Sequence, residues 1–237
     1  YNSSGIKQWS KQLGTGANDY GWGITTDSSD NIYVSGPTSG SLDGNTNSGG
    51  ADIFLVKYNS SGSKQWTKLL GSSSNDNAYG VATDSSGNIY ITGYTQGNLD
   101  GNTHLGSNDI FLVKYNSSGT KQWTKQYGSS RDDSANGIAT DSSGNIYVTG
   151  YTQGNLDGNH DSGSQDIFLL KYNSSGTQQW IKQLGESNSS DVGEDITVDS
   201  SDNIYLTGRT NGNLDGNTNS GNWDMFIVKY NADGVLQ

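Results

Sequence analysis

The stretch DSSGNIYVTGYTQGNLDGN, residues 141–159, recurs along the chain in near-identical copies and sets its architecture. The interval between copies is 57, 57 and 58 residues, because the Asn-Ile-Tyr core begins at Asn31, Asn88, Asn145 and Asn203. A period of this length is typical of a supersecondary unit that stacks on copies of itself. The sequence therefore predicts a single repeat domain over residues 1–237. Its copies are residues 1–57, 58–114, 115–171 and 172–229, and residues 230–237 begin a fifth.

Each copy contains four strand signals. In the second copy, residues 79–84 and 88–93 are short β-branched runs separated by a Ser-Ser-Gly turn. After a long polar loop comes DIFLVKY at 109–115, a continuous apolar run typical of a strand buried on both faces. KQWTKQYG at 121–128 alternates in polarity, as an outer strand does. Each copy is therefore predicted to form one four-stranded antiparallel sheet.

Packing four such sheets around an axis buries both faces of the inner three strands and leaves the lysine-bearing fourth strand at the edge. The sequence thus predicts an all-β fold, a β-propeller of four four-stranded blades. We expect residues 6–14, an outer-strand sequence, to pair with the last sheet at residues 224–230 and close the ring. Residues 234–237 match the first half of the same strand and compete for that place. A parallel β-helix, the main alternative, has much shorter coils.

The repeat also resembles a known family. DSSGNIYVTGYT, followed by LDGNT and then by DIFLVKYNSSGTKQW, is similar to the bacterial propeller repeat called SBBP, over essentially the whole chain. The resemblance implies a propeller in a bacterial surface or secreted protein, and it implies little about activity. The copies depart from one another at Pro37 and Arg209, where others have tyrosine, and at Asp195, where others have glycine.

Composition limits the partners and the compartment. The formal net charge of −11 argues against a nucleic-acid partner, because phosphate contacts require clustered lysine or arginine. The chain has no cysteine, so neither disulfides nor thiolate chemistry contribute. No apolar run approaches the roughly 18 residues of a membrane-spanning helix, so we expect no membrane insertion. We expect an extracellular or cell-surface location, in a bacterium.

One face of the propeller is predicted to carry the long loops, because strand direction alternates and every second connection lies at the same end. Near the axis on this face, one repeat position varies in residue type, and Trp223 occupies a second variable position. Exposed aromatic rings beside carboxylates and amides suit sugar stacking or protein contact. The alternative is random drift at solvated positions. The candidate ligand-binding residues are Trp22, Tyr79, Asn136, Glu194 and Trp223.

The same loops carry paired aspartates, nine residues apart. Two carboxylates with an asparagine amide and loop carbonyls can offer Ca²⁺ the hard oxygen ligands it prefers, and no other cofactor is expected. The alternative, which we prefer because the EF-hand spacing is absent, is that the first aspartate forms a turn and the second caps the following strand. The candidate metal ligands are Asp43 and Asp52, Asp100 and Asp109, Asp157 and Asp166, and Asp215 and Asp224.

Catalytic signatures are missing from the sequence. No G-x-S-x-G motif is present, and His104 and His160 lie at different repeat positions. We therefore expect a noncatalytic extracellular binding or adhesion module that presents an acidic loop face to a glycan or a protein. The alternative is a structural spacer or a self-associating unit of a larger surface assembly. A glycoside-processing enzyme is the third hypothesis, and it would need two carboxylates in distinct environments.

Overall fold

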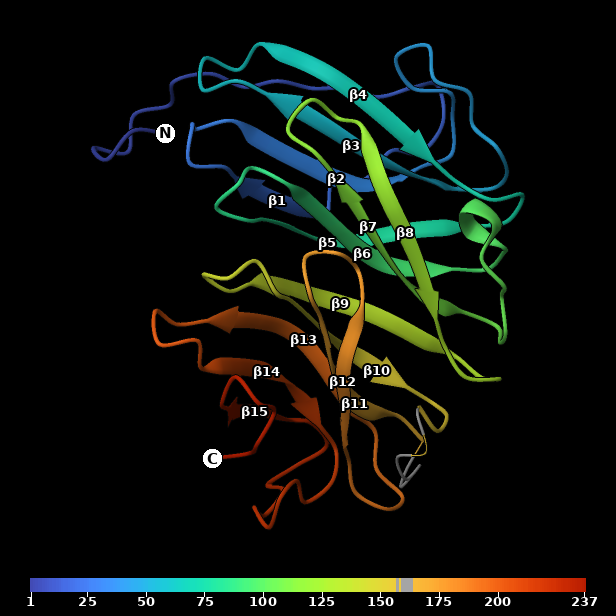
Figure 1. Ribbon diagram of the computed structural model, residues 1–237, viewed down its shortest axis with the longest axis vertical. Helices are drawn as coiled ribbons and strands as arrows, with labels where there is room; N and C mark the ends of the chain where they lie inside the picture. The colour runs from blue at the N-terminus through green and yellow to red at the C-terminus, as the bar shows by residue number, and fades with distance from the viewer. Residues whose placement is uncertain (157, 159–163) are drawn as a thin grey trace.

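The computed structural model describes residues 1–156, 158 and 164–237, and it is an all-β structure of four antiparallel sheets, blades 1 to 4 (Figure 1). Blade 1 contains β1 (Gly23–Thr26), β2 (Ile32–Thr38), β3 (Asp52–Tyr58) and β4 (Lys64–Leu70). Blade 2 contains β5 (Asp76–Thr83), β6 (Ile89–Thr95), β7 (Asp109–Tyr115) and β8 (Lys121–Tyr127). Blade 3 contains β9 (Asp133–Thr140), β10 (Ile146–Thr152), β11 (Asp166–Tyr172) and β12 (Gln178–Leu184). Blade 4 contains β13 (Asp191–Val198), β14 (Ile204–Thr210) and β15 (Asp224–Tyr230).

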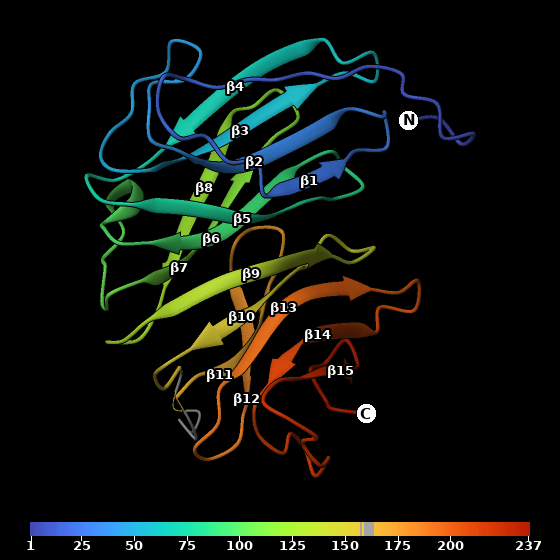
Figure 2. The same ribbon diagram turned by 180° about the vertical axis from the view of Figure 1, so that it is seen from behind.

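The blades stand in a row, and each sheet follows chain order from inner to outer strand. The inner strands contact one another in succession, β1 with β5, β5 with β9, and β9 with β13. Blades 1 and 4 lie at opposite ends of the row in both views (Figures 1 and 2). A one-turn 3₁₀ helix, η1 (Leu99–Gly101), lies in the long loop of blade 2. In the described part of the chain, no helix is long and apolar enough to cross a bilayer.

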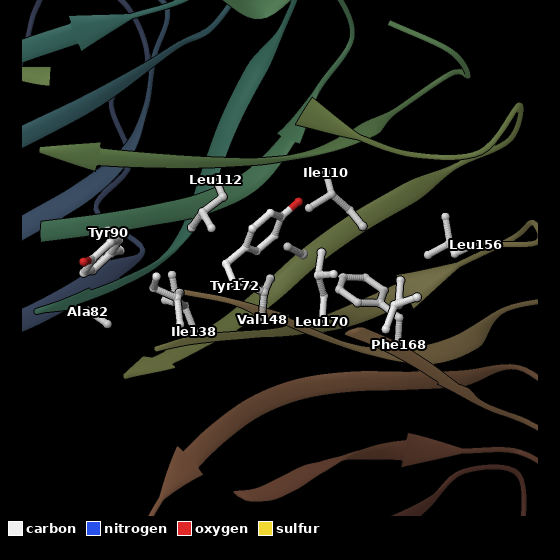
Figure 3. Packing of buried hydrophobic residues seen from close by; sticks show 13 residues of the cluster. Ala82, Tyr90, Ile110, Leu112, Ile138, Val148, Leu156, Phe168, Leu170 and Tyr172 are labelled. Carbon is white, nitrogen blue, oxygen red and sulfur yellow. The ribbon is translucent and has the colours of Figure 1, made fainter. Parts of the chain in front are cut away.

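The hydrophobic core lies between neighbouring blades. Ile110 and Leu112 of β7 belong to one buried cluster with Val148 of β10 and with Phe168 and Leu170 of β11 (Figure 3). A second buried cluster joins blades 1 and 2, and a third joins blades 3 and 4. Continuous apolar third strands such as DIFLVKY are required because each of their faces packs against a different neighbour.

Hydrogen bonds repeat across the same interfaces. Lys57 Nζ, at the end of β3, donates to the Ser117 carbonyl in the turn of blade 2, at 3.2 Å. Lys114 makes the equivalent bond to Ser174 of blade 3 at 2.8 Å, and Lys171 makes it to blade 4 at 2.9 Å. These third-strand lysines therefore join one blade to the next.

The inner strands of blades 2, 3 and 4 each contain a β-bulge. In blade 2, Ala78 pairs with Gly93 and Gly80 pairs with Thr92, so Tyr79 is the extra residue. The bulge pushes the Asn77 carbonyl towards Gly93, where a Cβ atom would lie only 1.9 Å from that oxygen. Glycine is therefore required opposite the bulge, because any larger side chain meets rigid backbone.

The structure differs from the predicted closed ring. Residues 6–14 do not pair with blade 4, and blade 4 has three strands instead of four. The reason is that the N-terminal segment packs against blade 1: Trp9 Nε1 donates to the Ser60 carbonyl at 3.2 Å, and its ring covers Gly62. Residues 234–237 contribute only a single bridge, between Leu236 and Tyr230. The blades are those of a propeller, but the row is open.

Replacement of Gly93 by alanine tests the requirement for glycine opposite the bulge. We expect Gly93→Ala to lower the free energy of unfolding by about 2 kcal/mol or more, because the new methyl group overlaps a backbone oxygen. The measurement is urea denaturation followed by tryptophan fluorescence. Gly16→Ala is the matched control, since nothing lies within 4 Å of a Cβ there. Equal stability of the two variants would contradict the bulge geometry.

Candidate ligand-binding site

The two ends of each blade differ, as predicted. One end carries tight turns, in which an aspartate accepts hydrogen bonds from the turn backbone: Asp84 Oδ1 accepts from the Ser86 and Asn88 amides, each at 2.9 Å. Asp84 Oδ2 also accepts a hydrogen bond from the Tyr90 hydroxyl at 2.9 Å. The long loops and the connections between blades lie at the other end, where the inner strands begin. This loop face is where the candidate ligand-binding residues are found.

The variable position identified in the sequence is the bulge residue of each inner strand. Tyr79, Asn136 and Glu194 are the unpaired bulge residues of β5, β9 and β13. Trp22 is their counterpart in blade 1, where its amide donates to the Ser35 carbonyl at 3.0 Å and the next residue, Gly23, pairs with Ser35. A bulge turns its extra residue out of the strand alternation, so this position can vary without disturbing the core.

The structure brings the aromatic members together into a row of rings on blades 1 and 2. Trp22 stacks on Tyr79 with ring centroids 4.8 Å apart and planes at 20°. Tyr20 stacks on the other side of Trp22 at 5.7 Å, and Tyr94 of β6 contacts Tyr79 at 5.9 Å in a tilted arrangement. Tyr20 and Trp22 are about half exposed. We call Tyr20, Trp22, Tyr79 and Tyr94 the aromatic row.

Sequence reasoning missed Tyr20 and Tyr94 as members of this row. The counterparts of Tyr20 in the next blades are Asn77 and Ser134, so no repeated pattern marks the position. Tyr94 stands where blade 1 has Pro37 and blade 4 has Arg209, a position noted in the sequence only because the copies differ there. Tyr94 lies close to Tyr79 because Tyr94 pairs with Asn77, and the bulge residue Tyr79 follows two positions after Asn77.

Blades 3 and 4 carry the polar continuation of this face. Asn136 donates through its side-chain amide to the Gly193 carbonyl at 2.8 Å, which links the bulge of β9 to that of β13. Glu194 forms an ion pair with Arg209 of β14 at 3.2 Å. The Arg209 guanidinium lies over the Trp223 ring, 5.1 Å from its centroid. The structure thus joins Glu194 and Trp223 through Arg209, which was not among the predicted site residues.

Below the face, the inner strands of blades 2, 3 and 4 each begin with an aspartate that accepts hydrogen bonds from the preceding loop and from the second strand. The buried Asp76 accepts hydrogen bonds from Thr95 Oγ1, from the Ser72 amide at 2.6 Å and from the Ser72 hydroxyl at 2.9 Å. Burial raises the pKa of Asp76, although these hydrogen bonds oppose the shift. Asp133 has the same contacts with Thr152 and Ser129. The hydrogen bonds of these carboxylates therefore hold the start of each of these strands in place, three residues before its bulge residue.

The paired aspartates proposed as calcium ligands have separate contacts. Asp43 and Asp100 form ion pairs with Lys64 and Lys121 of the outer strands. Their partners cap strand starts: Asp109 accepts from the Leu105 amide at 2.8 Å. Asp52, Asp166 and Asp224 accept from Ser48 at 2.7 Å, from Gln183 at 2.8 Å and from the Ser220 amide.

Asp52, Asp109 and Asp224 accept from backbone amides just before their strands, as strand caps do, whereas Asp166 accepts from a side chain. Asp157 lies outside the described residues, and the calcium site itself stays a prediction. Over residues 1–156, 158 and 164–237, no three histidine, aspartate or glutamate side chains are grouped as they would be around a metal ion.

The Tyr79 hydroxyl provides a probe of the row. Burial raises its pKa from 10.0 to about 12, with a smaller contribution from Tyr94. Since the folded-state pKa lies above the unfolded value, the contribution of neutral Tyr79 to stability is complete below about pH 10 and is lost between about pH 10 and pH 12.

Alkaline titration of phenolate absorbance should show this group directly. We expect the difference between the parent and Tyr79→Phe to titrate near pH 12, and we expect Trp22→Ala to lower this pKa, because it exposes Tyr79 to water. A difference curve centred on the ordinary tyrosine pKa would show that Tyr79 is not packed in the row.

The repeat of this chain matches the model of a known protein family. The SBBP model, a beta-propeller repeat, matches four times, at residues 8–43, 65–100, 122–157 and 179–215. Together these segments cover more than half of the chain, and each includes the first two strands of one blade.

The chain spans less than a quarter of the length of the curated relatives that it matches. Regulatory protein FlaEY of Caulobacter vibrioides is 26% identical over 76% of this chain, which spans 21% of that protein. An uncharacterized WD repeat-containing protein, L264 of Acanthamoeba polyphaga mimivirus, is 27% identical over 75% of this chain and 16% of its own length. A Bacteroides caccae protein of unknown function has a TM-score of 0.50 at 8% identity, over 96% of this chain and 62% of that chain, which shows similarity of fold alone.

Proposed function

Given that this chain belongs to the SBBP family of β-propeller repeat proteins, we propose that it is a noncatalytic binding module that holds a glycan on its loop face. The observation that carries the proposal is the aromatic row, in which the bulges of two neighbouring blades place Trp22 and Tyr79 ring on ring. Large aromatic side chains that stay exposed on a rigid sheet are typical of binding surfaces.

The ring surfaces left open suit sugar stacking. Tyr20 and Trp223 are each about half exposed, and each has one aromatic or cation–π contact among the described residues. One part of each ring is therefore available to the apolar face of a pyranose. Trp22 has rings on both sides, so it offers its edge and its indole N–H instead.

Polar groups beside these rings match the hydroxyl groups of a sugar. The exposed Glu194 and Arg209 provide acceptor and donor groups next to Trp223. The row lies on blades 1 and 2 and this pair lies on blade 4, so the face suits an extended chain better than a single monosaccharide. An extracellular or cell-surface setting in a bacterium, where polysaccharides are available, belongs to the proposal and is supported by the acidic composition.

A binding role without catalysis is supported by the contacts of the carboxylates near the face. Asp76 and Asp133 are buried and accept hydrogen bonds from their threonine and serine neighbours. Glu194 is already paired with Arg209. General acid and base catalysis of glycoside cleavage requires two carboxylates that reach the substrate from distinct environments, and these groups have other partners.

A glycan array with purified chain tests the proposal. We expect binding to a subset of polysaccharides, and we expect Trp22→Ala or Trp223→Ala to weaken it at least tenfold, because each removes a ring from the face. Leu105→Ala is the matched control, since Leu105 is also an exposed apolar side chain on a long loop but lies outside the row.

Two outcomes would contradict the glycan proposal. Binding that survives both tryptophan substitutions would place the ligand elsewhere on the molecule. Absence of glycan binding, together with capture of a protein ligand that depends on Trp22, would identify the face as a protein-binding surface.

A further inference from the structure

The residue that precedes the buried aspartate of β9 differs in charge from its counterparts. It is Asp132, whereas the other copies have asparagine or serine at this position. In blade 2, Asn75 Oδ1 accepts from the Ala51 amide at 3.0 Å, and Asn75 Nδ2 donates to Gln96 Oε1 at 3.0 Å. A carboxylate has no N–H group, so Asp132 cannot make the second of these hydrogen bonds. The repeat itself therefore does not require a charge at Asp132.

The Asp132 side chain lies on the same side of its sheet as Tyr151. Ser134 pairs with Tyr151 across β9 and β10. Two residues before Ser134, the Asp132 carbonyl accepts a hydrogen bond from the Gln153 amide at 2.8 Å. Because alternate residues of a strand point to the same face, Asp132 and Tyr151 are diagonal neighbours on one side of blade 3.

Asp132 also lies near Tyr94, which holds in blade 2 the repeat position that Tyr151 holds in blade 3. Burial raises the pKa of both tyrosines, and the negative charge of Asp132 adds to both shifts. The carboxylate is thus within electrostatic reach of one tyrosine from each blade. Tyr94 in turn contacts Tyr79, with ring centroids 5.9 Å apart. Asp132 therefore lies beside the aromatic row, where blade 2 meets blade 3.

One oxygen of the Asp132 carboxylate has no partner. Its Oδ1 atom is buried and makes no hydrogen bond to the described residues. The adjacent Arg131 binds elsewhere, since its Nη1 donates to the Gln153 carbonyl at 3.0 Å. A carboxylate oxygen without water or a donor is costly, so a cationic donor that reaches Asp132 is favoured. Asp132, Tyr94 and Tyr151 are each partly exposed, which gives a ligand on the loop face access to the carboxylate.

We infer that Asp132 determines the specificity of the loop face by holding the ammonium group of an amino sugar, so that the bound glycan carries free amino groups. This assignment rests on the glycan-binding function proposed above. A primary ammonium has three donors, which match the Asp132 carboxylate and the hydroxyl groups of Tyr94 and Tyr151. Tyrosine rings also attract cations. The net charge of −11 adds a long-range attraction for a cationic polymer.

A pair of oligosaccharides tests this preference. The probes are a glucosamine hexamer and its fully N-acetylated counterpart, compared by titration calorimetry at a slightly acidic pH, where the free amine is protonated. We expect the parent chain to bind the free-amine hexamer at least about tenfold more tightly, because acetylation removes the charge. Asp132→Asn should abolish this preference and leave the affinity for the N-acetylated hexamer unchanged. The fold accommodates this variant, since Asn75 occupies the same position in blade 2.

Two further variants serve as controls. Asp30→Asn removes the same charge from a tight turn at the opposite end of the blades, and asparagine tolerates the positive φ of 60° at this position. We expect Asp30→Asn to keep the parent's preference, because its charge lies far from the loop face. Trp22→Ala should weaken the binding of both hexamers, because it removes a ring of the aromatic row.

The outcomes separate this assignment from the proposed function. Equal affinity of the parent for both hexamers, with binding that still depends on Trp22, overturns the amino-sugar assignment and leaves glycan binding in place. A preference that survives Asp132→Asn overturns the role of Asp132. Absence of binding to every glycan overturns both, and binding of a lysine-rich peptide that is lost in Asp132→Asn would then assign the carboxylate to a protein ligand.

The position of the carboxylate has a test that needs no glycan. Asp132→Asn should lower the pKa of Tyr151, because the substitution removes one of the charges that raise it and leaves the larger effect of burial. The Tyr151 titration is obtained as the difference in phenolate absorbance between each protein and its Tyr151→Phe form. An unchanged Tyr151 titration in Asp132→Asn would contradict the placement of Asp132 beside this tyrosine.

Discussion

The packing of each blade's third strand against the inner strand of the next blade holds this molecule together. Apolar side chains such as Leu55 and Val81 bury one another there, and a lysine such as Lys57 extends the contact to the next turn. Because a single sheet cannot bury both its faces alone, the stability of each blade depends on its neighbours. The same dependence explains why blades 1 and 4, which each have a neighbour on one side, expose apolar side chains such as Ile24 and Ile227.

Each blade and the packing of neighbouring blades against one another could be predicted from the sequence, whereas the closure of the ring could not. The predicted strands 109–115 and 121–128 coincide with β7 and nearly with β8, since apolar runs and glycine turns mark their bounds. The first strand was predicted from residue 79, but β5 begins at Asp76, because the bulge at Tyr79 interrupts the alternation. Closure of the ring depends on the angle of rotation between neighbouring blades. Side-chain packing sets this angle, and the repeat period of the sequence does not reveal it.

The candidate site was only partly visible in the sequence, for a related reason. Trp22, Tyr79 and Glu194 were found because their repeat position varies in residue type among otherwise near-identical copies. The sequence pattern did not reveal that this position is a bulge, although the glycine opposite it, such as Gly93, is the physical signal of one. Tyr20 carried no repeated signal. A rigid repeat with one freely varying, outward-turned position per blade provides a scaffold on which binding residues can change without loss of the core.

The open row can be tested most directly by spin-label distances, because tight-turn positions repeat from blade to blade. Labels at Ser29 and Ser86 measure the separation of blades 1 and 2, and labels at Ser29 and Ser201 measure that of blades 1 and 4. All three positions are exposed, and dilution with unlabelled chain suppresses distances between molecules. An open row predicts a clearly longer distance for Ser29 and Ser201 than for Ser29 and Ser86. Equal distances, as in a closed ring of four blades, would contradict it.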